Sequence, residues 1–289
     1  MSNESLILIA DSGSTKSDWV LISGSEKKAF NTIGLNPFFH NEESVFEAIK
    51  SNDDLFLIRD EIKLIYFYGA GCSSEKLNAI IERGLNRVFV NAEIHVDHDL
   101  NACAYATYEG EPSISCILGT GSNSCYYDGK NVIEVVPALG YILGDEGSGT
   151  YFGKQLLSNY LYKRLPENIY KSFKEETGLT KDDIVSNVYM KPNANVYLAS
   201  FMKFITKHAD DEYIKEMFYE GFKRFNDIHV CCYSNYKDCK VHYIGSIAFL
   251  FADELKRACD FYDIQLGNII RKPIDGLIRY HEALLNSKI

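Results

Sequence analysis

Two short strings rich in glycine and hydroxyl residues could bind an anion through their backbone. They read Asp-Ser-Gly-Ser-Thr at 11–15 and Gly-Thr-Gly-Ser-Asn at 119–123, and each follows an apolar run. Glycine lets backbone N–H groups converge on an anion without a Cβ in the way, and the neighbouring hydroxyls add donors. Two such turns facing each other would hold a polyphosphate from both sides. The residues that we predict to bind phosphate are Ser12, Gly13, Ser14, Thr15, Lys16, Gly119, Thr120, Gly121 and Ser122.

Two charged residues flank the first of these turns. Asp11 ends the first apolar run, and a carboxylate there could hold a hydrated Mg²⁺, which takes few protein ligands. Lys16 could add positive charge next to a phosphate. An ordinary turn aspartate and a solvated lysine are the alternative interpretations, and the sequence leaves both open.

A third candidate is the acidic stretch Val96-Asp97-His98-Asp99, where a predicted strand gives way to an alanine-rich helix. A carboxylate at the carboxyl edge of a sheet is well placed to act as a general base, because α/β clefts lie at that edge. Asp99 is the candidate that we favour. Asp97 competes with it, although strand alternation could turn its side chain to the other face. A simple helix N-cap is the structural alternative for Asp99.

Two further glycine strings stand where helices should begin. Gly-Asp-Glu-Gly-Ser-Gly at 144–149 places two carboxylates among three glycines, and we predict that Asp145 binds polar substrate hydroxyls. An acidic residue that favours the helix dipole is the plainer interpretation. At 243–248 a strand runs through Gly245 and Ser246 into a helix, and a base or ribose could lie against the backbone there. Many strand-to-helix turns share this second pattern.

The elements that must position these residues form the same scheme twice. Each half begins with a three-strand meander around its glycine turn, and alternating strands and helices follow, which predicts a duplicated α/β fold with parallel pairing after the meander. Residues 165–210 are polar and predict helices and loops inserted into the second copy. The predicted strands are 6–11, 18–22, 27–31, 64–68, 94–97, 115–118, 122–127, 131–135 and 241–245. The predicted helices are 42–51, 74–86, 101–108, 149–163, 211–233, 248–261 and 273–285.

Composition narrows the class of protein. A hydrophobic content of 46% in 289 residues can build a packed core, and no apolar run approaches the roughly 20 residues that span a bilayer. The net charge of −10 argues against nucleic-acid or anionic-membrane partners. The eight cysteines are scattered without a C-x-x-C pair, and the N-terminal apolar run is too short for a signal peptide, which favours a cytoplasmic protein.

In this order, the four glycine strings resemble those of the superfamily of sugar kinases, heat-shock ATPases and actin. The resemblance is close to the N-acetylglucosamine kinases and the BadF/BadG-type ATPases. The second loop at 119–123 and the string at 144–148 match without change, whereas Ser12 replaces a glycine in the first loop and the turn at 245–246 is a weaker match. A run of Trp-Gly-His in mammalian-type members corresponds here to Leu139-Gly140-Tyr141.

The resemblance implies a fold of two ribonuclease-H-like domains around an ATP cleft, which is the duplicated actin-like ATPase fold. The domains expected are 1–110 and 111–289, with a helical insertion at about 150–210 and a last helix that packs back on the first domain. It also implies that Asp99 is the base, that Gly245 and Ser246 bind adenosine, and that Asp11 binds the metal. The residues implied to contact the sugar are Asn36, Asp99, Thr120, Gly121 and Asp145.

The activity implied is phosphorylation of an amino sugar by ATP and Mg²⁺, with N-acetylglucosamine and its 6-hydroxyl as the expected substrate and position. A homodimer is compatible with this expectation. One alternative is a BadF/BadG-type ATPase that activates a reductase, and another is a regulator that binds nucleotide and sugar without turnover. Reductase activators of that branch hold an iron–sulfur cluster between subunits. Cys103, Cys116 and Cys125 flank the junction of the halves, but they fall in a predicted helix and strands, where a buried thiol is expected.

Overall fold

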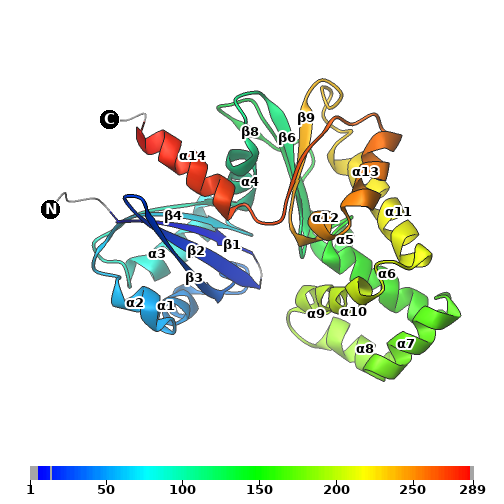
Figure 1. Ribbon diagram of the computed structural model, residues 1–289. Helices are drawn as coiled ribbons and strands as arrows, with labels where there is room; N and C mark the ends of the chain where they lie inside the picture. Colours follow the sequence, from blue (N-terminus) through cyan, green and yellow to red (C-terminus); the bar gives the residue numbers. More distant parts are fainter. Residues whose placement is uncertain (1–5, 14, 287–289) are drawn as a thin grey trace. The chain divides into compact units, whose positions relative to one another are not determined.

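The computed structural model describes residues 6–13 and 15–286 (Figure 1). The chain divides into two compact units. The first runs up to Thr107 and includes the segment from Pro273 onward, and the second is Tyr108–Lys272. The expected boundary at residue 110 lies close to the first crossing between the units. The C-terminal segment, which the expected ranges placed in the second domain, is part of the first unit.

The first unit is built on a mixed sheet of five strands in the order β3-β2-β1-β4-β5. The first three strands form the predicted antiparallel meander, and β4 and β5 continue it parallel to β1. The carboxyl ends of β1, β4 and β5 therefore lie along one edge of the sheet. The strands are β1 (Leu6–Ser12), β2 (Lys16–Ser23), β3 (Glu26–Ile33), β4 (Ile62–Gly69) and β5 (Glu93–His98).

Helices cover this sheet because β1 is apolar on both faces. Leu8 and Ala10 belong to the same buried cluster as Val45 of α1 and Ile81 of α3. The terminal helix α14 packs on α4, β1 and β2 instead, with Gly276 pressed against the backbone of Ala106. The helices of this unit are α1 (Glu42–Lys50), α2 (Asp53–Leu57), α3 (Glu75–Asn86), α4 (Asp99–Thr107) and α14 (Ile274–Asn286).

The second unit repeats the arrangement of the first. Its sheet has the order β10-β9-β6-β7-β8, in which β6, β7 and β8 form the antiparallel meander and β9 and β10 are parallel to β6. The duplicated α/β fold predicted from the sequence is confirmed. The strands are β6 (Ser113–Leu118), β7 (Ser122–Tyr127), β8 (Val132–Ile133), β9 (Lys240–Ile244) and β10 (Leu266–Ile270).

The two glycine turns occupy the same place in the two meanders, but their residues match in a different way from the sequence strings. The last strand pairs before the turns are Ser12 with Ser17 and Leu118 with Ser122. The backbone N–H of Gly13 then donates to Lys16 O, and that of Gly119 donates to Gly121 O, both at 3.0 Å. Gly13 is thus equivalent to Gly119 and not to Gly121. The first turn is one residue longer, which the similar composition of the strings conceals.

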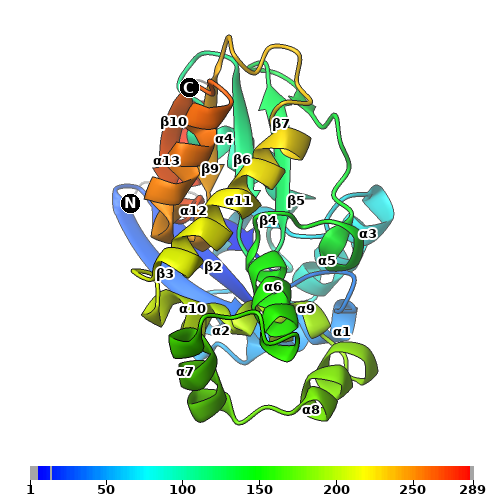
Figure 2. The same ribbon diagram turned by 90° about the vertical axis from the view of Figure 1, so that its right-hand side faces the viewer.

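Helices of the second unit pack through aromatic side chains. Phe218 of α11 stacks on Phe152 of α6 at 3.7 Å between ring centroids and on Phe251 at 3.5 Å. Figure 2 shows α11 and α13 side by side. These helices are α5 (Gly140–Leu143), α6 (Gly149–Leu161), α11 (Glu212–His229), α12 (Ser246–Leu250) and α13 (Ala252–Phe261). The insertion contains α7 (Glu167–Thr177), α8 (Lys181–Val185), the π-helix η1 (Ser186–Met190), α9 (Ala194–Ser200) and α10 (Met202–Lys207).

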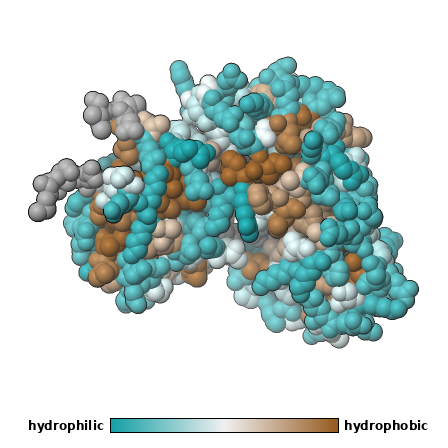
Figure 3. Space-filling view, viewed as in Figure 1, coloured by the Kyte–Doolittle hydropathy of each residue, from teal (hydrophilic) through white to brown (hydrophobic). Residues whose placement is uncertain are grey.

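Some elements differ from the sequence-based expectation. The helix predicted over 248–261 is interrupted at Phe251, and the strand predicted over 131–135 is only the two residues of β8. The short helices α2 and α5 and the strand β10 were not predicted. The face seen in Figure 3 is largely hydrophilic, with hydrophobic residues showing in patches. Within the described ranges, no helix combines the length and apolar character needed to cross a membrane.

Candidate functional site

The first glycine turn is exposed, but Ser12 beside it is not. The Ser12 hydroxyl is completely buried, lies 2.6 Å from Ser17 Oγ and accepts the backbone N–H of Leu35 at 2.8 Å. Its side chain therefore holds a loop in place and is not directed to a phosphate. Gly13, Thr15 and Lys16 are exposed at the turn, and Asp11 is half-buried before it, whereas Ser14 lies outside the described residues.

Lys16 already has an anionic neighbour. Its Nζ lies 2.8 Å from Asp18 Oδ1, and half of the lysine side chain is exposed. Because the carboxylate of Asp18 offsets the ammonium charge, Lys16 could help to bind a phosphate only in competition with Asp18.

The loop that Ser12 holds carries Asn36. Asn36 is buried, and its Oδ1 accepts the backbone N–H of Phe38 at 2.9 Å. The turn after β4 lies against it, because a Cβ at Gly71 would be 2.5 Å from that oxygen. The side-chain amide oxygen of Asn36 is thus already hydrogen-bonded within its own loop. A ligand of Asn36 would be bound through the Nδ2 amide, which can donate.

The two aspartates at the β5–α4 junction have different surroundings. Asp97 Oδ1 accepts the backbone N–H of His98 at 2.8 Å. Asp99 is the first residue of α4, and its Oδ1 lies 3.2 Å from His98 Nε2. Burial, followed by the charges of Asp99 and Asp97, raises the pKa of the Cys72 thiol to about 12. Both carboxylates therefore lie near the turn that follows β4, at the edge where β1 also ends.

The second glycine loop is bound to the start of α6. The backbone N–H of Gly149 donates to Gly119 O at 2.8 Å, and that of Thr150 donates to Thr120 O at 3.1 Å. The buried Ser148 caps the helix, since its Oγ accepts the N–H of Tyr151 at 3.2 Å. The start of α6 therefore holds the glycine loop in place, and the N–H groups of Gly149 and Thr150 are used to bind that loop.

Asp145 lies directly against the loop. It has a left-handed backbone, with φ of 60°, which is uncommon for a residue with a side chain. Its Oδ1 accepts the N–H of Ser122 at 3.2 Å, and its Oδ2 accepts the hydroxyl of Thr150 at 3.4 Å. Burial raises the pKa of Asp145, and the bonds from Ser122 and Thr150 oppose that rise. A Cβ at Gly121 would lie only 2.9 Å from Asp145 Oδ1, so a larger residue there would have to displace that carboxylate.

Glu146 and His229 form a pair that was not predicted from the sequence. Glu146 Oε2 lies 3.5 Å from His229 Nε2, and the histidine is buried near the end of α11. Burial lowers the pKa of His229, whereas the charge of Glu146 acts in the opposite direction. Lys154 donates to the carbonyl oxygen of Tyr141 close by. No local pattern marks His229, because its partner comes from a distant part of the chain.

Gly245 follows β9 and has a backbone conformation that only glycine accommodates. Its φ is 127°, and a Cβ there would lie 2.2 Å from the carbonyl oxygen of Leu118. Its N–H donates to Ile270 O at 2.9 Å, and Ser246 begins α12. The turn predicted to bind adenosine is therefore packed directly on the strand that leads into the second glycine loop.

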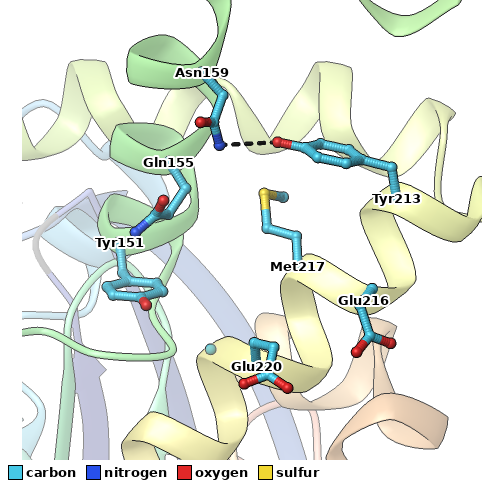
Figure 4. A pocket seen from close by; sticks show the side chains of 8 residues that line it. Tyr151, Gln155, Asn159, Tyr213, Glu216, Met217 and Glu220 are labelled. Carbon is cyan, nitrogen blue, oxygen red and sulfur yellow. Dashed lines mark hydrogen bonds between the residues drawn. The ribbon is translucent and has the colours of Figure 1, made fainter. Parts of the chain in front are cut away.

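A pocket of about 290 Å³ lies elsewhere in the second unit, between α6 and α11 (Figure 4). Across it, Asn159 Nδ2 donates to the hydroxyl of Tyr213 at 2.9 Å. None of the site residues predicted from the sequence lines this pocket. Its lining residues are Tyr151, Gln155, Asn159, Tyr213, Glu216, Met217, Glu220 and Gly221.

Three solved structures are similar to the chain over almost its whole length. Two are described as putative N-acetylglucosamine kinases. The one from Porphyromonas gingivalis is 36% identical, has a TM-score of 0.89, and the match covers 95% of this chain and 98% of that one. The one from Chromobacterium violaceum is 14% identical with a TM-score of 0.74, over 96% and 99% of the two chains. A ROK family glucokinase from Streptomyces griseus, in complex with glucose and AMPPNP, is 14% identical with a TM-score of 0.56, over 96% and 99%.

No family model and no curated protein matches the sequence. The two structures at 14% identity show a common fold, the two-domain actin-like fold of the sugar kinases. The Porphyromonas gingivalis protein shows more, because 36% identity extends over nearly all of both chains. The chain therefore belongs to the same family as that protein, within the sugar kinases of actin-like fold.

Proposed function

We propose that the protein is an ATP-dependent sugar kinase that phosphorylates N-acetylglucosamine at its 6-hydroxyl. The observation that carries this proposal is the 36% identity to the Porphyromonas gingivalis protein, which is described as a putative N-acetylglucosamine kinase. The fold shared with a glucokinase agrees with the broader activity, transfer of a phosphoryl group to a sugar. The four glycine strings that carry the resemblance to sugar kinases are all present in the chain.

In this proposal Asp99 accepts the proton of the attacking hydroxyl. Asp97 is the weaker candidate, since its Oδ1 accepts the backbone N–H of His98. The side chain of Asp99 is one-quarter exposed at the carboxyl edge of the sheet, where a substrate could reach it. Positioning and charge neutralisation account for most of the catalysis of phosphoryl transfer, so the base acts on a substrate that the rest of the site has already oriented.

The two turns bind the phosphates in this proposal. The N–H groups of Gly13 and Gly119 close the turns, so these glycines leave room for a phosphate to approach, and the backbone amides of Thr15, Thr120 and Gly121 are the proposed donors. The turns fit this role because a Cβ at Gly13 or at Gly119 would meet nothing closer than 3.7 Å and 4.0 Å, respectively, so their outer faces are open. Asp11 would hold Mg²⁺, which would supply positive charge to the phosphates when bound. Ser12 holds the loop at Leu35 and the Ser122 side chain is buried, so neither hydroxyl is assigned to a phosphate.

The sugar is bound by short polar groups in this proposal. Asn36 offers its Nδ2 amide, and Asp145 offers a carboxylate held in place by Ser122 and Thr150. Thr120 and Gly121, in the loop that Asp145 lies against, also contact the sugar. Gly245 and Ser246 bind the adenosine. Both units must contribute residues for this assignment to hold.

A coupled assay of ADP release against a panel of hexoses and N-acetylhexosamines tests the proposal. We expect N-acetylglucosamine to be the best substrate, with the 6-phosphate identified by phosphorus NMR. ADP release without a phosphorylated sugar would indicate an ATPase instead. Iron and sulfide bound stoichiometrically after anaerobic purification, with activity lost in air, would identify a reductase activator. Nucleotide and sugar binding without turnover would indicate a regulator.

A further inference from the structure

His98 stands next to the proposed base and contacts it. His98 Nε2 lies 3.2 Å from Asp99 Oδ1, and the side chains of the two residues are 22% and 25% exposed. We propose that His98 is a positioning residue that holds the carboxylate of Asp99 in the orientation needed to accept the substrate proton. This inference rests on the proposed function and deepens it.

The backbone at the junction makes the pair possible. Neighbouring side chains on a strand point to opposite faces, so His98 and Asp99 would diverge if β5 continued. The chain instead enters α4 at Asp99, and Asp97 Oδ1 accepts the N–H of His98 at the turn. The change from strand to helix brings the imidazole and the carboxylate together.

The chemistry of the contact suits a base. An imidazole that donates from Nε2 occupies one carboxylate oxygen, Oδ1, and restricts rotation of the side chain. Because Oδ1 is held by His98, the orientation of the whole carboxylate is fixed. Oδ2 is the oxygen that accepts the hydroxyl proton in this proposal.

The same strand provides a control pair. His95 Nε2 lies 3.0 Å from Glu93 Oε1, with the side chains 50% and 72% exposed. Partly exposed pairs of this kind contribute little to stability. Loss of either pair should therefore leave the fold intact. Only loss of the His98 contact should alter catalysis.

Side-chain length distinguishes a specific contact from a general effect. The amide nitrogen of glutamine reaches about as far as the Nε2 of histidine, whereas that of asparagine reaches only as far as Nδ1. For His98→Ala and His98→Asn we expect kcat to fall about tenfold, part of the roughly 10²–10⁴-fold that a positioned base contributes. The KM values for ATP and sugar should change little. His98→Gln should restore most of kcat, and His95→Ala should match the wild type.

Either of two kinetic results would overturn the inference: a wild-type kcat in His98→Ala, or a His98→Gln variant no better than His98→Ala. NMR of the histidine side chains provides a readout that needs no turnover. Asp99→Asn should shift the Nε2 resonance of His98 and leave that of His95 unchanged, and an unshifted His98 would refute the contact. If the wild-type protein phosphorylates none of the sugars, the proposed function fails, and the NMR result still decides whether the pair exists.

Discussion

At the scale of single residues, replacing Asp99 with asparagine tests the base most directly. Asparagine is nearly isosteric but accepts no proton, so we expect kcat to fall by roughly 10²–10⁴-fold. ATP affinity, measured by calorimetry, should remain near that of the wild type. Asp97→Asn is the matched control and should cost much less, because Asp97 Oδ1 serves the backbone N–H of His98. Wild-type turnover in Asp99→Asn would move the base to Asp97 or elsewhere.

Substitutions at two glycines of the second loop should separate the binding of sugar from the binding of ATP. A methyl group at Gly121 would lie 2.9 Å from Asp145 Oδ1, whereas one at Gly119 would meet only Gly121 O, at 4.0 Å. Gly121→Ala should therefore displace Asp145 and raise the KM for sugar by about tenfold, the cost of roughly one lost hydrogen bond to a charged group. Gly119→Ala should raise mainly the KM for ATP, because its methyl group points to open space above the turn. Steady-state kinetics with each substrate varied measures both, and equal effects on both substrates would contradict the division.

Candidate site residues could be predicted from the sequence where a short, distinctive string lies at the junction of two elements. Asp99 and Asp145 stand out in this way, and the structure places one at the start of α4 and the other against the second glycine loop. Ser12 was predicted to bind phosphate, but its contacts with Ser17 and Leu35 bury it. His229 could not be predicted, because its contact with Glu146 depends on how α11 packs.

At the scale of elements, periodicity predicted most of the longer strands and helices but not β10. The sequence of β10 contains Gly267 and Asn268, which weaken any strand pattern. The structure shows that this strand depends on its neighbour. Its register with β9 shifts between Leu266 and Ile269, and the ring of His242 fills the space, with Nδ1 accepting the N–H of Asn268 at 3.0 Å. Such a strand forms through tertiary contacts that no local pattern encodes.

The terminal helix α14 should become less stable as the pH falls. His281 on this helix is buried, bonds to the hydroxyl of Tyr68 at 2.8 Å and stacks on Tyr66. Burial, followed by the charge of His95, lowers the pKa of His281 from 6.5 to about 4. The unfolded chain therefore binds more protons between these values, and stability present above pH 6.5 is lost as the pH falls toward 4. The loss amounts to at most about 3 kcal/mol at 1.36 kcal/mol per pKa unit.

Urea unfolding at pH 7 and at pH 5 measures this effect. The double variant His281→Phe, Tyr68→Phe keeps both rings and removes the titrating group together with the hydroxyl that it would leave unpaired. We expect the variant to lose less stability than the wild type between the two pH values. The remaining loss would come from His229 and His242, whose pKa values burial also lowers. An identical loss in wild type and variant would contradict the role of His281.

At the scale of the whole molecule, the repeated strings predicted the duplication because each copy needs a glycine turn between its first two strands. The equal strand order of the two sheets confirms it. The exact match of Gly13 with Gly119 depends on turn length, which composition does not reveal. The proposed activity uses both units, with Asn36 and Asp99 in the first and Asp145 in the second.

The proposed site also predicts how the protein discriminates between sugars. N-acetylglucosamine and glucose differ only at carbon 2, where an acetamido group replaces a hydroxyl. A polar group of the site left without its partner costs roughly 1–3 kcal/mol, so we expect kcat/KM for N-acetylglucosamine to exceed that for glucose by about ten- to a hundredfold. Equal efficiency on both sugars would refute this specificity. Asn36→Asp then locates the contact, because it keeps an oxygen for the N–H of Phe38 and removes the Nδ2 donor. A loss confined to N-acetylglucosamine would place Asn36 at the acetamido group, whereas equal losses on both sugars would place it at a hydroxyl that they share.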